Sequence, residues 1–244
     1  AVATKTYVDD VFSTYLWAGN GTSGRTITNN IDVSGEGALV WMKSRSTGHV
    51  NVLFDTERGA NQRLRSDSNL GQNNTDTLQP SFTSSGFTVG SGNEVNGSGN
   101  DYTSWTFRKA KGFFDIVTYT GNAAWPERKI SHNLGAIPGC IMIKNLSSSG
   151  DWHVYHVGAD SINPQYYALK LNESDAKNNT ADPQYWNNTL PTSTQFTVGN
   201  DSGNRPNNID GDNYVAYLFA GGKSDAAKAR SVDFDGSNDG LTVP

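Results

Sequence analysis

The chain has almost no cysteine, no clustered positive charge and no long apolar run. Its one cysteine, Cys140, has no partner for an internal disulfide, which excludes a disulfide-stapled secreted domain. No segment approaches the roughly 18 consecutive apolar residues that span a bilayer, and no signal peptide is recognisable at Ala1, so we expect no membrane insertion. The net charge is −5 and the densest basic run is residues 108–111, which argues against a nucleic-acid partner.

The polar part of the composition consists mainly of small residues. Charged residues make up only 18% of the chain, so asparagine, serine, threonine, glycine and aspartate supply most of its polarity. These residues compete with the helical backbone and favour turns between strands. Aromatic residues, at 11%, are sufficient for several packed cores, which argues against disorder. The composition therefore predicts an all-β protein.

An internal repeat is the most informative pattern in the sequence. Residues 11–110 are repeated at low identity by residues 113–221, and the recurring positions are apolar and aromatic, whereas the polar loops differ. Four segments correspond in the same order: Phe12 with Phe114, residues 38–43 with 139–144, residues 87–90 with 196–199, and residues 102–107 with 214–219. A repeat of core residues indicates a packing scaffold rather than a catalytic motif. We expect two tandem copies of an antiparallel β-sandwich, jelly-roll-like, with a pseudo-twofold relation, and the sequence leaves open whether they form separate or composite sandwiches.

The chain divides into five segments by composition. They are an N-terminal lead (1–10), the first copy (11–110), the second copy (113–221), a linker (222–230) and the first hairpin of a further module (231–244). Residues 38–43 lack alternation, which predicts a strand buried on both faces. Residues 66–80 are nearly devoid of apolar side chains, which predicts a long surface loop.

Four sequence segments carry a resemblance to a known family: residues 7–17, 37–45, 104–110 and 133–139. Together they resemble a duplicated β-rich module of tail-fibre-like and other virion structural proteins of marine bacteriophages. Residues 231–244 resemble the opening hairpin of a concanavalin-like (laminin-G-like) domain, which often follows that module. The resemblance implies a virion location, contacts with other virion proteins, and a homotrimer. It carries over no catalytic residue, cofactor or metal ligand.

The second copy contains aromatic residues that are candidates for binding a glycan. Sugar rings stack on exposed aromatic side chains, and neighbouring amides and carboxylates bind their hydroxyls. Trp125, Trp152, Tyr185 and Trp186 lie in or near polar loops and lack the alternation of core strands. We therefore predict that these four residues bind a host-surface glycan; the alternative is that they cap the ends of the sandwich cores.

Other candidate sites are weaker. His153 and His156 are three positions apart in a predicted strand, so they point to opposite faces and cannot share a metal. Cys140 lies in an apolar run, which favours a packed thiol over a nucleophile. No pair of carboxylates is singled out for glycoside hydrolysis. Residues 210–212 and 233–239 have calcium-type oxygen ligands, but turn chemistry explains both runs better.

The sequence therefore predicts a non-enzymatic virion structural protein, a tail-fibre or appendage module involved in host attachment, with no cofactor. Three alternatives stay open. A capsid decoration, cement or head-fibre protein would contact the shell and have no affinity for cells. A glycan depolymerase would need a cleft with paired carboxylates. A bacterial surface adhesin would need a secretion signal upstream.

Overall fold

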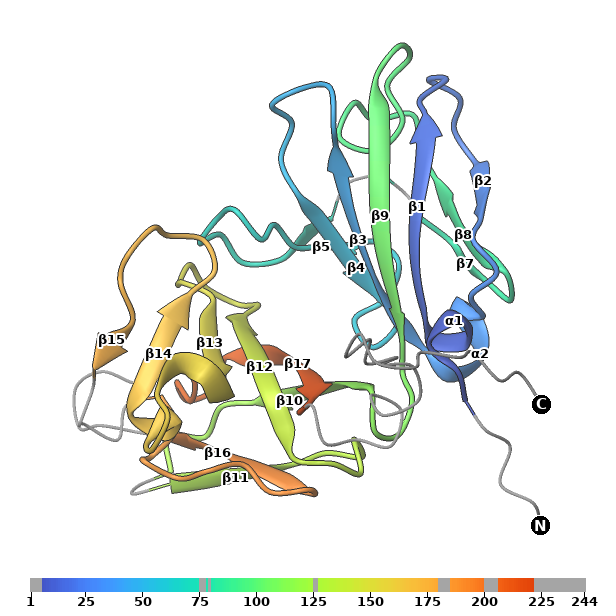
Figure 1. Ribbon diagram of the computed structural model, residues 1–244. Helices are drawn as coiled ribbons and strands as arrows, with labels where there is room; N and C mark the ends of the chain where they lie inside the picture. Colours follow the sequence, from blue (N-terminus) through green and yellow to red (C-terminus); the bar gives the residue numbers. More distant parts are fainter. Residues whose placement is uncertain are drawn as a thin grey trace, which may run out of the picture.

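The computed structural model describes residues 6–74, 78, 80–124, 127–179, 185–199 and 206–221. Within these ranges the chain is all-β with antiparallel sheets, as its composition predicts (Figure 1). The predicted linker (222–230) and terminal hairpin (231–244) lie outside the described residues.

Each half of the chain contains one large sheet and a smaller sheet that faces it. In the first half the large sheet has the order β1-β9-β3-β4. Its strands are β1 (Phe12–Ala18), β9 (Asp101–Arg108), β3 (Ala38–Ser44) and β4 (Val52–Asp55). The facing strands are β2 (Arg25–Thr28), β8 (Gly86–Val89) and β7 (Phe82–Thr83), and a short pair is β5 (Gln62–Arg63) with β6 (Asn73–Asn74).

The second half follows the same order of strands over most of its length. Its large sheet has the order β10-β17-β12-β13-β14-β15. The strands are β10 (Phe114–Thr120), β17 (Asn213–Ala220), β12 (Pro138–Asn145), β13 (His153–His156), β14 (Tyr167–Lys170) and β15 (Asn178–Asn179). The facing pair is β11 (Glu127–Ser131) with β16 (Gln195–Gly199). Each of the four segments that correspond in the sequence thus occupies the same place in its sheet.

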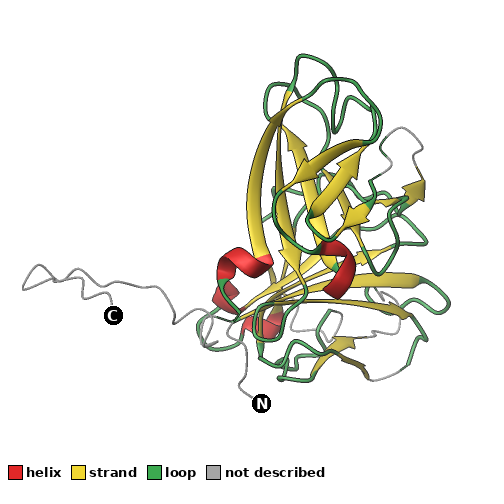
Figure 2. Cartoon of the chain, turned by 90° about the vertical axis from the view of Figure 1, so that its right-hand side faces the viewer, coloured by secondary structure: helices red, strands yellow, loops and turns green. Residues whose placement is uncertain are grey.

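In the described residues, helix is confined to single turns before the first strand and between strands (Figure 2). The turns are α1 (Val8–Val11), α2 (Val33–Glu36), η1 (Val157–Ala159) and η2 (Pro164–Tyr166). Asp32 caps α2 by accepting a hydrogen bond from the backbone N–H of Gly35 at 2.8 Å. Among the helices of the described ranges, none is long and apolar enough to cross a membrane.

The apolar residues form three cores rather than two. One core fills the first half around Phe54 and Phe87, and a second fills the other half around Phe196 and Leu218. The third core lies between the two large sheets and includes Leu39 from the first half. Each half is therefore a sandwich with its own core, and the outer faces of the two large sheets meet in a shared one.

Strand β17 shows how the sequence builds two cores from one strand. Tyr214, Ala216 and Leu218 point into the second core, whereas the intervening Val215 and Tyr217 point into the shared core. Side chains alternate across a strand, so a strand with both faces covered has no polar positions. Residues 38–43 lack alternation for the same reason. Val40 and Met42 face the first core and Leu39 faces the shared core, which confirms the predicted burial on both faces.

The first part of the predicted surface loop (66–80) is exposed over most of its length but is held against the second half. Residues 65–72, here called the bridging loop, connect β5 to β6 and lie along residues 146–150. The carbonyl of Asn69 accepts from the N–H of Gly150 at 2.8 Å, and the N–H of Gln72 donates to the carbonyl of Leu146 at 3.1 Å. A side chain at Gly71 would place its Cβ 2.7 Å from the Leu146 carbonyl oxygen, so glycine is needed for this approach. The composition of the loop does not predict this contact, because backbone groups, which every residue has, form these two hydrogen bonds.

Candidate functional site

Three of the four aromatic residues predicted to bind glycan lie in the interior. Trp152 has no exposed surface, contacts the shared core and donates from Nε1 to the Arg65 carbonyl at 2.8 Å. Tyr185 and Trp186 line the second core, and Nε1 of Trp186 donates to the Tyr167 carbonyl at 2.9 Å. A buried ring has no free face for a sugar, so the prediction that these three residues are exposed is wrong.

The fourth predicted aromatic, Trp125, lies outside the described residues. The three buried rings were misassigned because they sit next to polar loops. Trp152 precedes the strand β13, and its indole reaches from the loop into the space between the sheets.

The two histidines of β13 lie on opposite faces, as predicted. His153 is buried and its Nδ1 lies 2.8 Å from Oδ1 of Asn207, whereas His156 is exposed. Burial lowers the pKa of His153 to about 4, so its ring is neutral at neutral pH. In the described part of the chain, no group of three or more His, Cys, Asp or Glu side chains could hold a metal ion.

The neutral His153 should make the fold sensitive to acid. Its pKa is about 4 in the folded chain and ~6.5 in the unfolded chain, so between these values the unfolded chain binds more protons. Stability from this group is complete above pH ~6.5 and lost as the pH falls through about 4, a change of roughly 3 kcal/mol. Chemical denaturation from pH 7 to 4 should show a shallower pH dependence in His153→Gln than in the wild type. The variant His156→Gln serves as the control, and an equal change in both variants would contradict the assignment.

Cys140 has the environment of a packed thiol. It is partly buried against the shared core, and burial raises its pKa to about 11. A thiol with so high a pKa is almost entirely protonated at neutral pH and is a poor nucleophile.

Among the described residues, the most buried carboxylate belongs to a polar network between the halves. Asp55 has no exposed surface; its Oδ2 lies 2.5 Å from Nε of Arg58 and accepts from the hydroxyl of Tyr217 at 2.6 Å. Arg58 also donates to the Tyr217 hydroxyl at 3.2 Å. The neighbouring Asp55 and Tyr217 oppose the effect of burial, and the pKa of Arg58 stays above its usual value. This network satisfies the charges that lie in the shared core and joins β4 to β17.

Turn chemistry accounts for the carboxylate of Asp212. Its Oδ2 accepts from Asn145 Nδ2 at 2.7 Å and from Ser148 Oγ at 2.9 Å, which ties two loops of the second half together. The second candidate calcium run, residues 233–239, lies outside the described residues.

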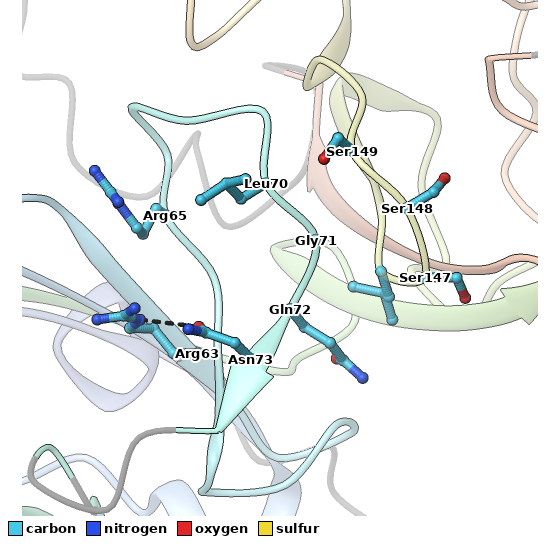
Figure 3. Close-up of a pocket in the computed structure, with 10 residues that line it drawn as sticks. Arg63, Arg65, Leu70, Gly71, Gln72, Asn73, Ser147, Ser148 and Ser149 are labelled. Atoms are coloured by element: carbon cyan, nitrogen blue, oxygen red, sulfur yellow. Dashed lines mark hydrogen bonds between the residues drawn. The ribbon is translucent and has the colours of Figure 1, made fainter.

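The cleft between the halves is a concave feature of the described surface that is lined from both halves. One cavity of about 290 Å³ lies where the bridging loop meets residues 146–149, and a neighbouring cavity of about 360 Å³ shares Gln72 and Leu146 with it. Figure 3 shows the first cavity: Arg63, Arg65 and Leu70 lie on one side of Gly71, and the serines of residues 147–149 lie on the other. The cleft therefore has a basic wall from the first half and a hydroxyl-rich wall from the second.

The pairing of Leu64 with Leu53 positions the two arginines of the basic wall. Arg63 and Arg65 flank Leu64, which is buried in the shared core and bridges to Leu53. Because side chains alternate along an extended chain, the two arginines share the face opposite to Leu64. The indole of Trp152 fixes the backbone here through the Arg65 carbonyl. Sequence reasoning missed this site because nothing in residues 62–73 predicts that they contact the second half.

Comparisons with known proteins give one match. A sequence model of a domain of unknown function (DUF7483) matches residues 8–243. No curated protein matches the chain, and no solved structure matches it.

Proposed function

Because the chain belongs to the DUF7483 family, whose function is unknown, we propose a role from its sequence and architecture. The role is that of a non-enzymatic structural module of a phage virion, in a tail fibre or similar appendage that contacts the host. The resemblance of residues 7–17, 37–45, 104–110 and 133–139 to virion proteins of marine bacteriophages is the source of this proposal.

One observation supports a structural role above others: the corresponding residues of the two halves are those that build the cores. Trp17 stacks on Tyr102 at 5.5 Å in the first half, and Tyr119 stacks on Tyr214 at 5.0 Å in the second. An enzyme would be expected to keep polar side chains at one site, whereas a scaffold keeps its packing and varies its loops.

We propose further that the halves are tandem copies of one ancestral unit with a pseudo-twofold relation. The loops at the strand ends support this, because they are held by corresponding bonds. The N–H of Gly97 donates to the Tyr102 hydroxyl at 2.8 Å, and the N–H of Ile209 donates to the Tyr214 hydroxyl at 3.0 Å. Lys43 and Lys144 each donate to three backbone carbonyls.

Antibody labelling of purified particles tests the proposed location. Antibodies raised against this chain should detect it in gradient-purified particles of the phage that encodes it, and immunogold should mark an appendage. Excess purified protein should also reduce adsorption of those particles to host cells. Gold confined to the capsid shell, without any effect on adsorption, would replace the proposal with a decoration protein. Release of oligosaccharide from host capsule by the purified protein would replace it with a depolymerase.

We also propose that the protein forms a homotrimer, because the virion proteins that it resembles are expected to be trimers. A stable interface buries on the order of 1,200–2,000 Å² in total, so a trimer should persist at micromolar concentration. Light scattering coupled to size exclusion would measure its mass, and a strictly monomeric protein would remove this part of the proposal.

A further inference from the structure

The basic wall of the cleft has hydrogen-bonding capacity that the protein leaves unused. Nε of Arg63 donates to Oδ1 of Asn73 at 3.1 Å, but its contact with Glu94 is long, at 3.7 Å. Nε of Arg65 lies 3.5 Å from Asp67, and this buried atom makes no hydrogen bond. A guanidinium has five donors arranged in a rigid fork that matches a carboxylate or phosphate.

The charge balance of the cleft favours an anionic occupant. The cavity lining includes both arginines and no carboxylate. The side chains of Glu94 and Asp67 are 31% and 39% exposed, so their long ion pairs are weak and can give way to a better placed anion. Burial and the neighbouring Arg65 lower the pKa of Arg63 and Glu94 raises it; a bound anion would favour the charged guanidinium and so oppose the repulsion from Arg65. Two cations are thus held side by side with incomplete compensation.

The remaining walls suit a polar ligand with several hydroxyls. Ser149 stands across Gly71 from the arginines (Figure 3), and the side-chain oxygen of Gln72 is buried without a hydrogen-bond partner. Leu70 is 53% exposed and offers an apolar surface beside Arg65. The volume of about 290 Å³ lies at the lower edge of the ~300–1,000 Å³ found for drug-sized ligands, which suits a single sugar residue. The lining contains no aromatic ring on which a nucleobase could stack.

We propose that this cleft binds an acidic sugar residue of a surface glycan, with the carboxylate of the sugar between Arg63 and Arg65. Ser149 and Gln72 contact the hydroxyls, and Leu70 covers the apolar face of the ring. The identity of the glycan as a host receptor rests on the proposed function, whereas binding of the sugar itself does not. Bridging the cleft, the ligand touches both halves of the chain.

Titration of the purified protein with sugars tests the proposal. Glucuronate, galacturonate and N-acetylneuraminate are added while amide and arginine Nε–H signals are followed by NMR, and glucose, galactose and inorganic phosphate are added in parallel. We expect saturable shifts at the cleft with at least one acidic sugar and none with the neutral sugars. Phosphate binding as tight as that of the acidic sugars would overturn the sugar assignment, and no binding of any acidic sugar would overturn the site.

Two arginine variants separate the site from a general charge effect. Arg65→Gln removes one charge-assisted contact and should weaken binding by about tenfold to 100-fold. Arg45→Gln removes the same charge from an exposed position outside the cavity lining and should leave affinity unchanged. Equal losses in the two variants would overturn the proposal, and melting curves show that each variant is folded. If particles carry this chain on an appendage but the protein binds no acidic sugar, sugar binding at the cleft is refuted and the virion role remains. If the protein binds an acidic sugar but is absent from particles, the virion role is refuted and the sugar site remains.

Discussion

Replacing Trp152 by alanine should lower the free energy of unfolding by about 3–5 kcal/mol, the range for truncating a large aromatic residue in a core. Trp152 has no exposed surface and stacks on Tyr217 with ring centroids 6.1 Å apart. The substitution also leaves the carbonyl of Arg65 without its indole donor. Urea denaturation followed by circular dichroism would measure the change.

A control for Trp152→Ala is Ile162→Ala, because Ile162 is 78% exposed. Its replacement should change the free energy of unfolding by less than about 0.5 kcal/mol. A small effect of Trp152→Ala, similar to that of the control, would mean that the indole does not join the halves. It would also restore Trp152 as a candidate for glycan stacking.

The second large effect is expected at the buried ion pair. Asp55→Asn removes the negative charge that compensates Arg58 in the shared core, and breaking a buried pair in this way costs about 3–5 kcal/mol. The loss should appear as a lower denaturation midpoint with an unchanged dependence on urea, which indicates reduced stability with the same compactness.

A triple variant distinguishes charge compensation from simple loss of packing. Asp55→Leu, Arg58→Met and Tyr217→Phe together remove every member of the network, so no charge or hydroxyl is left unpaired. The triple variant should be more stable than Asp55→Asn, because apolar replacement of a whole buried pair is often neutral. A triple variant less stable than Asp55→Asn would show that the network contributes more than the compensation of its own charges. Glu94→Gln, which alters a long and partly exposed pair, should have little effect.

The strand content could be predicted from the sequence because it depends on local pattern. Residues 38–42 and 214–219 have continuous apolar and aromatic character, and each lies in a strand that is covered on both faces. The sequence pattern also predicts that His153 and His156 lie on opposite faces, because side chains alternate along one strand.

The relation between the halves could not be predicted in the same way. The third core explains why residues 38–42 and 214–218 show no alternation of apolar and polar side chains, but the sequence gives no sign of which outer faces meet. The bridging loop makes its contacts through the backbone of Asn69 and Gln72, and polar composition says nothing about such contacts. Trp152 was therefore placed at a loop surface, although its side chain lies between the sheets. The cleft with Arg63 and Arg65 was missed because its two walls lie far apart in the chain.

The shared core also constrains how such a protein can change by recombination. Loops whose bonds stay within one half, such as residues 90–100, can be exchanged more freely than the bridging loop, which is bonded to the other half. Exchanging a whole half is different, because the outer face of its large sheet must pack against the half that remains. A new second half would have to pack against Leu39, Leu53 and Leu64, and a new first half against Met142 and Val215. A half received from a distant relative would expose an apolar surface and favour aggregation. The shared core therefore ties each half to its own partner, and a change confined to a loop should be tolerated better than the exchange of a whole half.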